Sequence, residues 1–368
     1  WMYRSCRFNN MCFDAETRQF VLFPSHHHQM LRSQVHKNIF LSSIPGEMIS
    51  SGQHNMWLSM GRGKWVPEIR NASNITSFYQ LMHDTVWISF FPVGGCNPGH
   101  FLWDTLLPIF TLLEIFDFLD KKLFFTEMTM KRKRNCVEPM QDFGPMMGIK
   151  NGTLPKNEEI GISGISKNES NIICAPYSAS GMAWFTDHGL NRHGSTNTDF
   201  LNPHNIGKGP TLNRFRSYLL SNLGMPIDHN PLQRKPYNVT FSILSSKDDD
   251  RRFDFTVQSQ AVQAALGKEV QVNSFAMWNY TVHQQIQIAS QSAVFISIGG
   301  GGTAPAFFLP QGASLIVYGK ENERMDWDLW NNYARIRVHW MSTKHMDADT
   351  KLLVDLIQDE LESLPDLM

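Results

Sequence analysis

The sequence predicts an α/β fold with a parallel sheet in the second half of the chain. Short apolar runs rich in β-branched residues, such as 293–298 and 314–318, are typical of strands buried on both faces. From Tyr237 onward these runs alternate with helix-length segments, which is the pattern of βαβ units. With 368 residues, 42% of them hydrophobic and 18% charged, the chain is also large enough for two globular domains.

The first half is expected to be less regular than the second. Its predicted elements are strands at 8–13, 19–23 and 84–92, a helix from His100, a core helix within 106–119 and a strand at 169–175. Residues 129–170 are polar and weakly periodic, which indicates a surface excursion.

The second half reads as a regular series. Its expected elements are a helix at 211–223, a strand at 237–244, a polar loop at 245–252, a helix at 253–266, a strand at 269–272, a helix at 281–289, a strand at 293–298, a helix at 304–309, a strand at 314–318 and a helix at 348–361. A segment through Arg234, Lys235 and Pro236 has the composition of a linker. We therefore expect an N-terminal domain over 1–228 and a C-terminal domain over 229–368.

Composition limits the classes of function. The net charge of −1 argues against a nucleic-acid binder, which needs excess Lys and Arg. No apolar run is long enough to span a membrane, so an anchor is expected only upstream of Trp1. Among five cysteines without metal-ligand spacing, Cys6 and Cys12 are close enough in sequence for a small-loop disulfide. Six N-glycosylation sequons favour the secretory lumen: Asn71, Asn74, Asn151, Asn168, Asn238 and Asn279.

The most informative motif is the glycine run Gly299–Gly302, followed by Thr303. It follows a predicted buried strand and precedes a short helix with Pro305 in its first turn. Bare backbone at the carboxyl end of a parallel strand, next to a helix N-terminus, favours a phosphate. The run is neither a Walker loop nor the spaced dinucleotide fingerprint, and a turn required only for packing is the alternative.

A second candidate is the pair His100 and Asp104. Their spacing of four residues puts them on one face of a helix that follows a predicted strand. A carboxylate beside a histidine fixes its tautomer and raises its basicity, as a general base requires. The alternative is a histidine near the helix cap with a surface partner.

Two further groups follow predicted strands. Ser246, Lys247, Arg251 and Arg252 come after the strand at 237–244, where hydroxyls and cations suit a diphosphate, although a solvated loop is equally typical of such residues. Glu321 comes after the strand at 314–318, where a carboxylate can bind ribose hydroxyls, or can simply belong to an acidic loop.

These segments, in this order, resemble glycosyltransferase family 61, which includes plant xylosyl- and arabinosyltransferases and animal O-GlcNAc transferases. The resemblance covers most of the chain. It rests on four segments: Cys6–Asp14; Gly99–Asp104; Leu244–Lys247 with Arg251 and Arg252; and Gln285, Gly300–Gly302, Phe308–Pro310 and Gly312. The chain departs from the family pattern at three points: no His precedes the glycines, Lys247 replaces an Arg, and the last strand is followed by Glu321 at a distance instead of ending in Glu.

The resemblance implies a GT-B fold, with two Rossmann-like domains facing across a cleft. The N-terminal domain would present a glycan or glycoprotein acceptor, and the C-terminal domain would bind a UDP-sugar of the xylose, arabinose or GlcNAc class. Inverting transfer with His100 as base would need no metal and no further cofactor. The implied location is the lumen of the Golgi or endoplasmic reticulum, with the full-length protein a type II membrane protein.

Two alternatives remain open. A metal-dependent transferase of GT-A type would use the acidic run Asp248–Asp250 as its metal ligands. A catalytically inactive lumenal glycan-binding protein would account for the missing histidine before the glycines.

Overall fold

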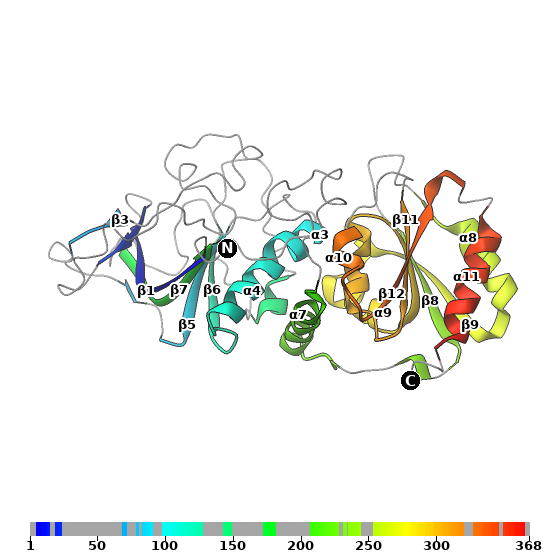
Figure 1. Ribbon diagram of the computed structural model, residues 1–368, viewed down its shortest axis with the longest axis horizontal. Helices are drawn as coiled ribbons and strands as arrows, with labels where there is room; N and C mark the ends of the chain where they lie inside the picture. Colours follow the sequence, from blue (N-terminus) through cyan, green and yellow to red (C-terminus); the bar gives the residue numbers. More distant parts are fainter. Residues whose placement is uncertain are drawn as a thin grey trace. The chain divides into compact units, whose positions relative to one another are not determined.

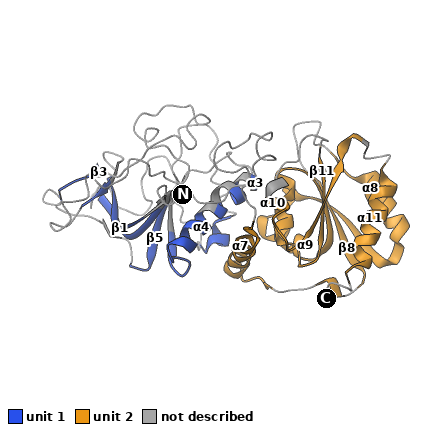
Figure 2. Ribbon diagram, viewed as in Figure 1, with its two compact units in different colours: residues 1–193 blue, residues 194–368 orange. Residues whose placement is uncertain are grey.

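The computed structural model describes two compact units, residues 1–193 and 194–368 (Figure 2). The described residues are 5–14, 19–23, 68–71, 79–80, 83–90, 98–127, 143–148, 172–181, 207–227, 231–233, 235–243, 253–319, 327–345 and 349–364. The division lies N-terminal to the boundary expected from the sequence, and helix α7 (Gly209–Asn222) belongs to the second unit.

The first unit is built on a mixed seven-stranded sheet (Figure 1). Its strands are β1 (Ser5–Asp14), β2 (Gln19–Leu22), β3 (Glu68–Ile69), β4 (Tyr79–Gln80), β5 (Thr85–Phe90), β6 (Lys122–Glu127) and β7 (Ile172–Gly181). The order is β3-β2-β1-β7-β5-β6, and β4 also pairs with β7. β1 runs antiparallel to β2 and β7, whereas β5 runs parallel to β6 and β7.

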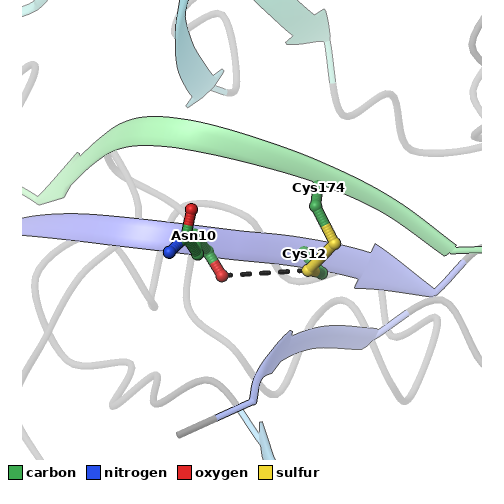
Figure 3. The surroundings of a disulfide bond; sticks show 3 residues. All are labelled: Asn10, Cys12 and Cys174. Carbon is green, nitrogen blue, oxygen red and sulfur yellow. Dashed lines mark hydrogen bonds between the residues drawn. A yellow bond between two sulfur atoms is a disulfide. The ribbon is translucent and has the colours of Figure 1, made fainter. Parts of the chain in front are cut away.

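A disulfide joins Cys12 on β1 to Cys174 on β7 (Figure 3). The two cysteines face each other directly in the antiparallel register. The predicted pairing of Cys6 with Cys12 is therefore wrong. Both lie on β1, and six residues of extended strand span about 20 Å, whereas a disulfide needs Cα atoms within about 7 Å.

One continuous helical segment follows β5. It consists of α3 (Pro98–Phe101), the π-turn η4 (Leu102–Leu106) and α4 (Leu107–Ile115). The helix expected from His100 is thus confirmed. Most of its described apolar side chains, including Trp103, are buried, and Ile115 at its end is exposed. A 3₁₀ turn, η5 (Gly144–Met147), completes the described helical elements of this unit.

The second unit contains a fully parallel five-stranded sheet, which confirms the predicted α/β class. Its strands are β8 (Tyr237–Ile243), β9 (Val270–Ala276), β10 (Ser292–Ile298), β11 (Ser314–Gly319) and β12 (Arg337–Ser342), in the order β12-β11-β10-β8-β9. β10 is buried along its whole length, as expected of a central strand.

Helices cover both faces of this sheet. α8 (Thr256–Leu266) and α11 (Thr350–Glu362) pack together on one face, and α9 (Val282–Ser290) packs with the 3₁₀ helix η10 (Gly301–Phe308) on the other (Figure 1). Short elements complete the unit: η6 (Pro231–Gln233), η8 (Gly267–Glu269), η9 (Met277–Asn279), α10 (Trp327–Trp330) and η11 (Thr343–His345). This is a doubly wound sheet. Among the described residues, no helix is long and apolar enough to cross a membrane.

A charged cluster fixes the C-terminal helix to the sheet. The Glu360 carboxylate on α11 lies 2.8 Å from Arg337 Nε and 3.1 Å from His339 Nε2, both on β12, and it accepts a hydrogen bond from Ser314 Oγ on β11. Burial alone would raise the pKa of Glu360. The hydrogen bonds from His339 and Ser314 and the charges of Arg337 and His339 outweigh burial, so this pKa lies below its ordinary value of 4.5.

Glu360 should therefore make stability depend on pH in the acid range. Because its folded-state pKa is depressed, its contribution is complete above pH 4.5 and is lost as the pH falls through the lower folded-state value. Between pH 6 and pH 3, the urea midpoint of Glu360→Gln should fall less than that of the wild type. The exposed Glu362 on the same helix gives a control, because Glu362→Gln should follow the wild-type slope. If the urea midpoints of Glu360→Gln and wild type fell equally between pH 6 and pH 3, the pKa of Glu360 would not be lowered by folding.

Candidate nucleotide-binding edge

The strand order of the second unit defines one crevice. From β8 the chain moves outward to β9 on one side, and from β10 it moves outward to β11 and β12 on the other. The connections of the adjacent strands β8 and β10 therefore diverge at their carboxyl ends. In doubly wound sheets, ligands bind at this topological switch point.

The glycine run lies at this edge, directly after β10. Gly299 N donates to the Tyr318 carbonyl at the end of β11, at 2.8 Å. Gly300 then adopts φ 107° and ψ −153°, a backbone conformation that is essentially restricted to glycine. Gly299, Gly300 and Gly302 are buried, whereas Gly301 is half-buried. Gly301 is thus the member of the run whose backbone is the most accessible to a ligand.

The helix after the glycines begins earlier than the sequence predicted. η10 starts at Gly301 instead of Ala304, and Pro305 lies inside it. In a 3₁₀ helix the N–H of Pro305 would bond to the Gly302 carbonyl, but proline has no N–H. Ser242 Oγ, fully buried near the end of β8, donates to that carbonyl at 3.3 Å instead. This hydroxyl connects β8 to the helix that follows β10, across the switch point.

Further hydrogen bonds hold both ends of η10. At its start, Thr303 N and Oγ1 donate to the Gly300 carbonyl at 2.9 and 2.7 Å. At its end, Tyr333 Oη donates to Phe307 O at 2.9 Å, and the buried Arg216 of α7 donates to Phe308 O at 3.4 Å. Burial raises the pKa of the Tyr333 phenol, so it remains a neutral donor. The helix that follows the glycine turn is therefore held in one position.

The chemistry of this edge suits an anion. The first N–H groups of a helix have no intrahelical partner, and the helix dipole places partial positive charge at the same end. At η10 these are the N–H groups of Gly301 and Gly302, after a turn without side chains. The turn is thus preorganised to accept oxygen atoms of a phosphate.

Replacing Gly300 should damage both the turn and this site. At φ 107° a Cβ is strained, so Gly300→Ala should lower the free energy of unfolding by about 1–3 kcal/mol. It should also abolish any rise in melting temperature caused by UDP, because the N–H groups of η10 would be redirected.

Gly224→Ala is a matched control for this prediction. Gly224 also has a positive φ, of 68°, but a Cβ added there would have no atom within 4 Å. It should cost about 1 kcal/mol and retain the UDP response. A UDP response unchanged in Gly300→Ala would remove the glycine turn from the site.

The other predicted donor-site residues lie outside the described residues. These are Ser246, Lys247, Arg251, Arg252 and Glu321. The chain enters their segments from the carboxyl ends of β8 and β11, which are neighbours of β10 on either side. Asp248–Asp250 are also outside the described residues. Within the described part of the chain, no group of three His, Cys, Asp or Glu side chains could hold a metal ion.

His100 and Asp104 lie in the first unit. Both have helical backbone, about one turn apart, and their side chains are outside the description. Asp104 lies in the π-turn, in which Leu107 N donates to the Leu102 carbonyl. Pro108 explains why a π-turn forms here. Proline has no N–H to donate to the Asp104 carbonyl, so the regular series of helical hydrogen bonds is interrupted at this point. Such π-turns are frequent at functional sites.

Ser242, Arg216 and Tyr333 are not among the residues that the sequence predicted for this edge. Ser242 carried a weak signal, as a hydroxyl-bearing residue next to the carboxyl end of a predicted strand. Arg216 and Tyr333 carried no signal, because their roles depend on contacts with carbonyl groups about 90 and 26 residues away in sequence.

Comparison with known proteins gives little further guidance. No protein-family model matches the chain, and no curated protein matches it. Among solved structures, the metal-soaked Flv1 flavodiiron core from Synechocystis sp. PCC6803 matches with a TM-score of 0.28 and 14% identity. The match covers 44% of this chain and 42% of that one.

Proposed function

We propose that the protein is an inverting, metal-independent glycosyltransferase. It would move a sugar of the xylose, arabinose or GlcNAc class from a UDP-sugar to a hydroxyl group of a glycan or glycoprotein. The observation that carries the proposal is the glycine turn at the β8–β10 switch point, where Gly300 has a glycine-specific conformation and leads into the N-terminus of η10. The resemblance to family 61 supplies the reaction class.

On the donor side, each group has a role. The backbone of Gly300–Thr303, with Ser246, Lys247, and Arg251 or Arg252, stabilises the charge that develops on the departing diphosphate. Lysine binds phosphate as a point charge, so Lys247 can replace the forked guanidinium of an arginine. Glu321 accepts hydrogen bonds from the ribose hydroxyls.

On the acceptor side, His100 acts as the base and Asp104 orients it. His100 takes the proton of the acceptor hydroxyl while the oxygen attacks the anomeric carbon from the face opposite the diphosphate. The new bond forms as the carbon–oxygen bond to the diphosphate breaks, so configuration inverts and UDP leaves. This mechanism belongs with a GT-B arrangement of the two units across a cleft, which is part of the proposal.

The disulfide supports a lumenal location. Disulfides persist in oxidising compartments and are rare in the cytosol, and Cys12 and Cys174 lie in register on adjacent strands. We therefore propose the lumen of the Golgi or endoplasmic reticulum, with any membrane anchor outside the present chain.

The test is release of UDP by the purified protein from a panel of UDP-sugars, with and without EDTA. Slow hydrolysis of one UDP-sugar that is insensitive to EDTA would support the proposal and identify the donor. Hydrolysis that EDTA abolishes would instead favour a metal site at Asp248–Asp250. Absence of turnover together with absence of a thermal shift by UDP would overturn the proposal and favour an inactive glycan-binding protein.

A further inference from the structure

The six N-glycosylation sequons look alike in the sequence, but the structure shows that those it describes differ in how well they could carry a glycan. Asn74, Asn151 and Asn168 are outside the described residues, and Asn71 is exposed but is followed by residues outside them. Two sequons are described in full, Asn238-Val239-Thr240 and Asn279-Tyr280-Thr281. Asn238 lies within strand β8, whereas Asn279 ends the short helix η9, and the two side chains also differ in exposure and in hydrogen bonding.

Asn279 lies at the surface on a well-held turn. It is exposed and ends the short helix η9, after which Tyr280 and Thr281 have extended backbone. Gln285 Nε2 donates to the carbonyls of both Met277 and Tyr280, at 2.9 and 3.0 Å. These bonds hold the backbone on either side of Asn279, and they give Gln285 a bracing role in this turn.

The side chains around Asn279 favour an outward acceptor. The ring of Tyr280 packs edge-on against Phe275, with centroids 5.6 Å apart, so the middle residue of the sequon is anchored on the protein. Thr281 forms the N-cap of α9, and its hydroxyl and the Gln284 side chain make a capping box. No hydrogen bond of the Asn279 side chain with the described residues would be lost by attaching a sugar.

Asn238 is the contrasting case. It lies in β8, which is paired on both sides, with β9 and β10. Its Nδ2 donates to the Gln291 carbonyl at 3.1 Å, and Thr240 of the same sequon is buried with its hydroxyl 2.8 Å from Ser292 Oγ. A glycan on Asn238 would have to separate β8 from the connection between α9 and β10.

We propose that Asn279 carries an N-linked glycan and that Asn238 does not. This inference rests on the lumenal location in the proposed function. In the reaction, the Asn279 amide nitrogen forms a bond to the anomeric carbon of a lipid-diphosphate oligosaccharide. The bond from that carbon to the diphosphate oxygen breaks, the lipid diphosphate leaves, and the amide nitrogen loses one proton. A lumenal oligosaccharyltransferase supplies the catalysis on the nascent chain. A chain that carries a glycan at Asn238 would lose the hydrogen bond to Gln291 and would not reach the folded, secreted state, whereas a chain that carries one at Asn279 would.

The position also gives the glycan a physical effect. Trp278, next to Asn279, is 52% exposed, which is unusual for so large an apolar side chain. β9 is the edge strand of the described sheet, and an open edge invites pairing with another chain. A glycan at the end of β9 would cover Trp278 and obstruct that pairing.

The test is glycan occupancy in the full chain, expressed behind a secretion signal in cells that perform N-glycosylation. We expect Asn279→Gln to remove one glycan from the intact mass, and Asn238→Gln to remove none. Thr281→Asn destroys the sequon but keeps a good N-cap, and should also remove one glycan. Thr281→Ser is the matched control, because it keeps both the sequon and the cap. Glycosidase treatment in heavy-oxygen water should label Asn279 as Asp in the corresponding peptide.

Either of two results would overturn the inference. One is an unmodified Asn279 peptide in the folded, secreted chain, and the other is a glycan on Asn238 in that chain. UDP-sugar hydrolysis is measured on the same preparations, so the two proposals can fail separately. Occupancy at Asn279 without turnover would count against the transferase alone, and turnover with an unmodified Asn279 would count against the glycan alone.

Discussion

Replacing Cys12 and Cys174 together by alanine is expected to lower the free energy of unfolding of the first unit by about 5 kcal/mol. The bond closes a loop with a sequence separation of 162 residues. In the chain-entropy model, a cross-link over such a loop destabilises the unfolded state by about 5 kcal/mol. Alanine is preferred to serine because both sulfurs lie in an apolar cluster with Val21, Phe23 and Ile172, where a hydroxyl group would be buried.

The measurement is urea unfolding of the oxidised wild type, the reduced wild type and the double variant. The reduced protein and the double variant should unfold at similar, much lower midpoints. Val21→Ala is the control for packing, because it removes apolar volume from the same cluster but leaves the cross-link, and should cost about 2 kcal/mol. A double variant no less stable than Val21→Ala would show that the cross-link contributes little beyond packing.

Replacing His100 by alanine is expected to reduce sugar transfer by about 100- to 10,000-fold, which is the range for loss of a general base. This corresponds to about 3–5 kcal/mol in the activation free energy. Stability should change by less than about 1 kcal/mol, as expected if the residue serves the reaction and not the packing of the unit. Asp104→Asn should have a smaller effect on transfer, since in the proposed mechanism that carboxylate acts only by orienting the histidine.

The measurement is the rate of transfer with the donor identified in the UDP-sugar panel, together with urea unfolding of each variant. His283→Ala is the matched control, because His283 is an exposed histidine on α9 in the second unit. It should leave transfer unchanged. Transfer that survives in His100→Ala would place the base elsewhere in the chain.

Much of the second unit could be predicted from its sequence. Strands β8, β10 and β11 and helices α8, α9 and α11 lie within a few residues of their expected positions. Central strands of a parallel sheet are rich in apolar and β-branched residues, and the helices that follow them begin or end at clear glycine, proline or capping residues. β12 was missed because it is half-buried along its length and includes Arg337 and His339, so it shows no apolar run. β6 was missed because charged residues open and close it.

The glycine run of the candidate site could be predicted from the sequence, but the hydrogen bonds that hold it in place could not. The glycine run could be recognised because a conformation such as that of Gly300 excludes other residues. The bonds that hold the turn could not be recognised, since Ser242, Arg216 and Tyr333 act on carbonyl groups that come near only in the folded chain. The start of η10 at Gly301 was also missed. A proline inside the helix leaves the Gly302 carbonyl without its N–H partner, and the Ser242 hydroxyl that replaces this partner is distant in sequence.

The sequence by itself determined the local features of this protein: the α/β class, most strands and helices of the second unit, the glycine turn and the helix that contains His100. These depend on periodicity and on conformational limits of single residues. The tertiary structure decided the strand order that puts the glycine turn at a switch point, the pairing of Cys12 with Cys174, and the difference between Asn238 and Asn279. Each of these depends on which distant segments become neighbours, and that is set by packing of the whole unit instead of by any local preference.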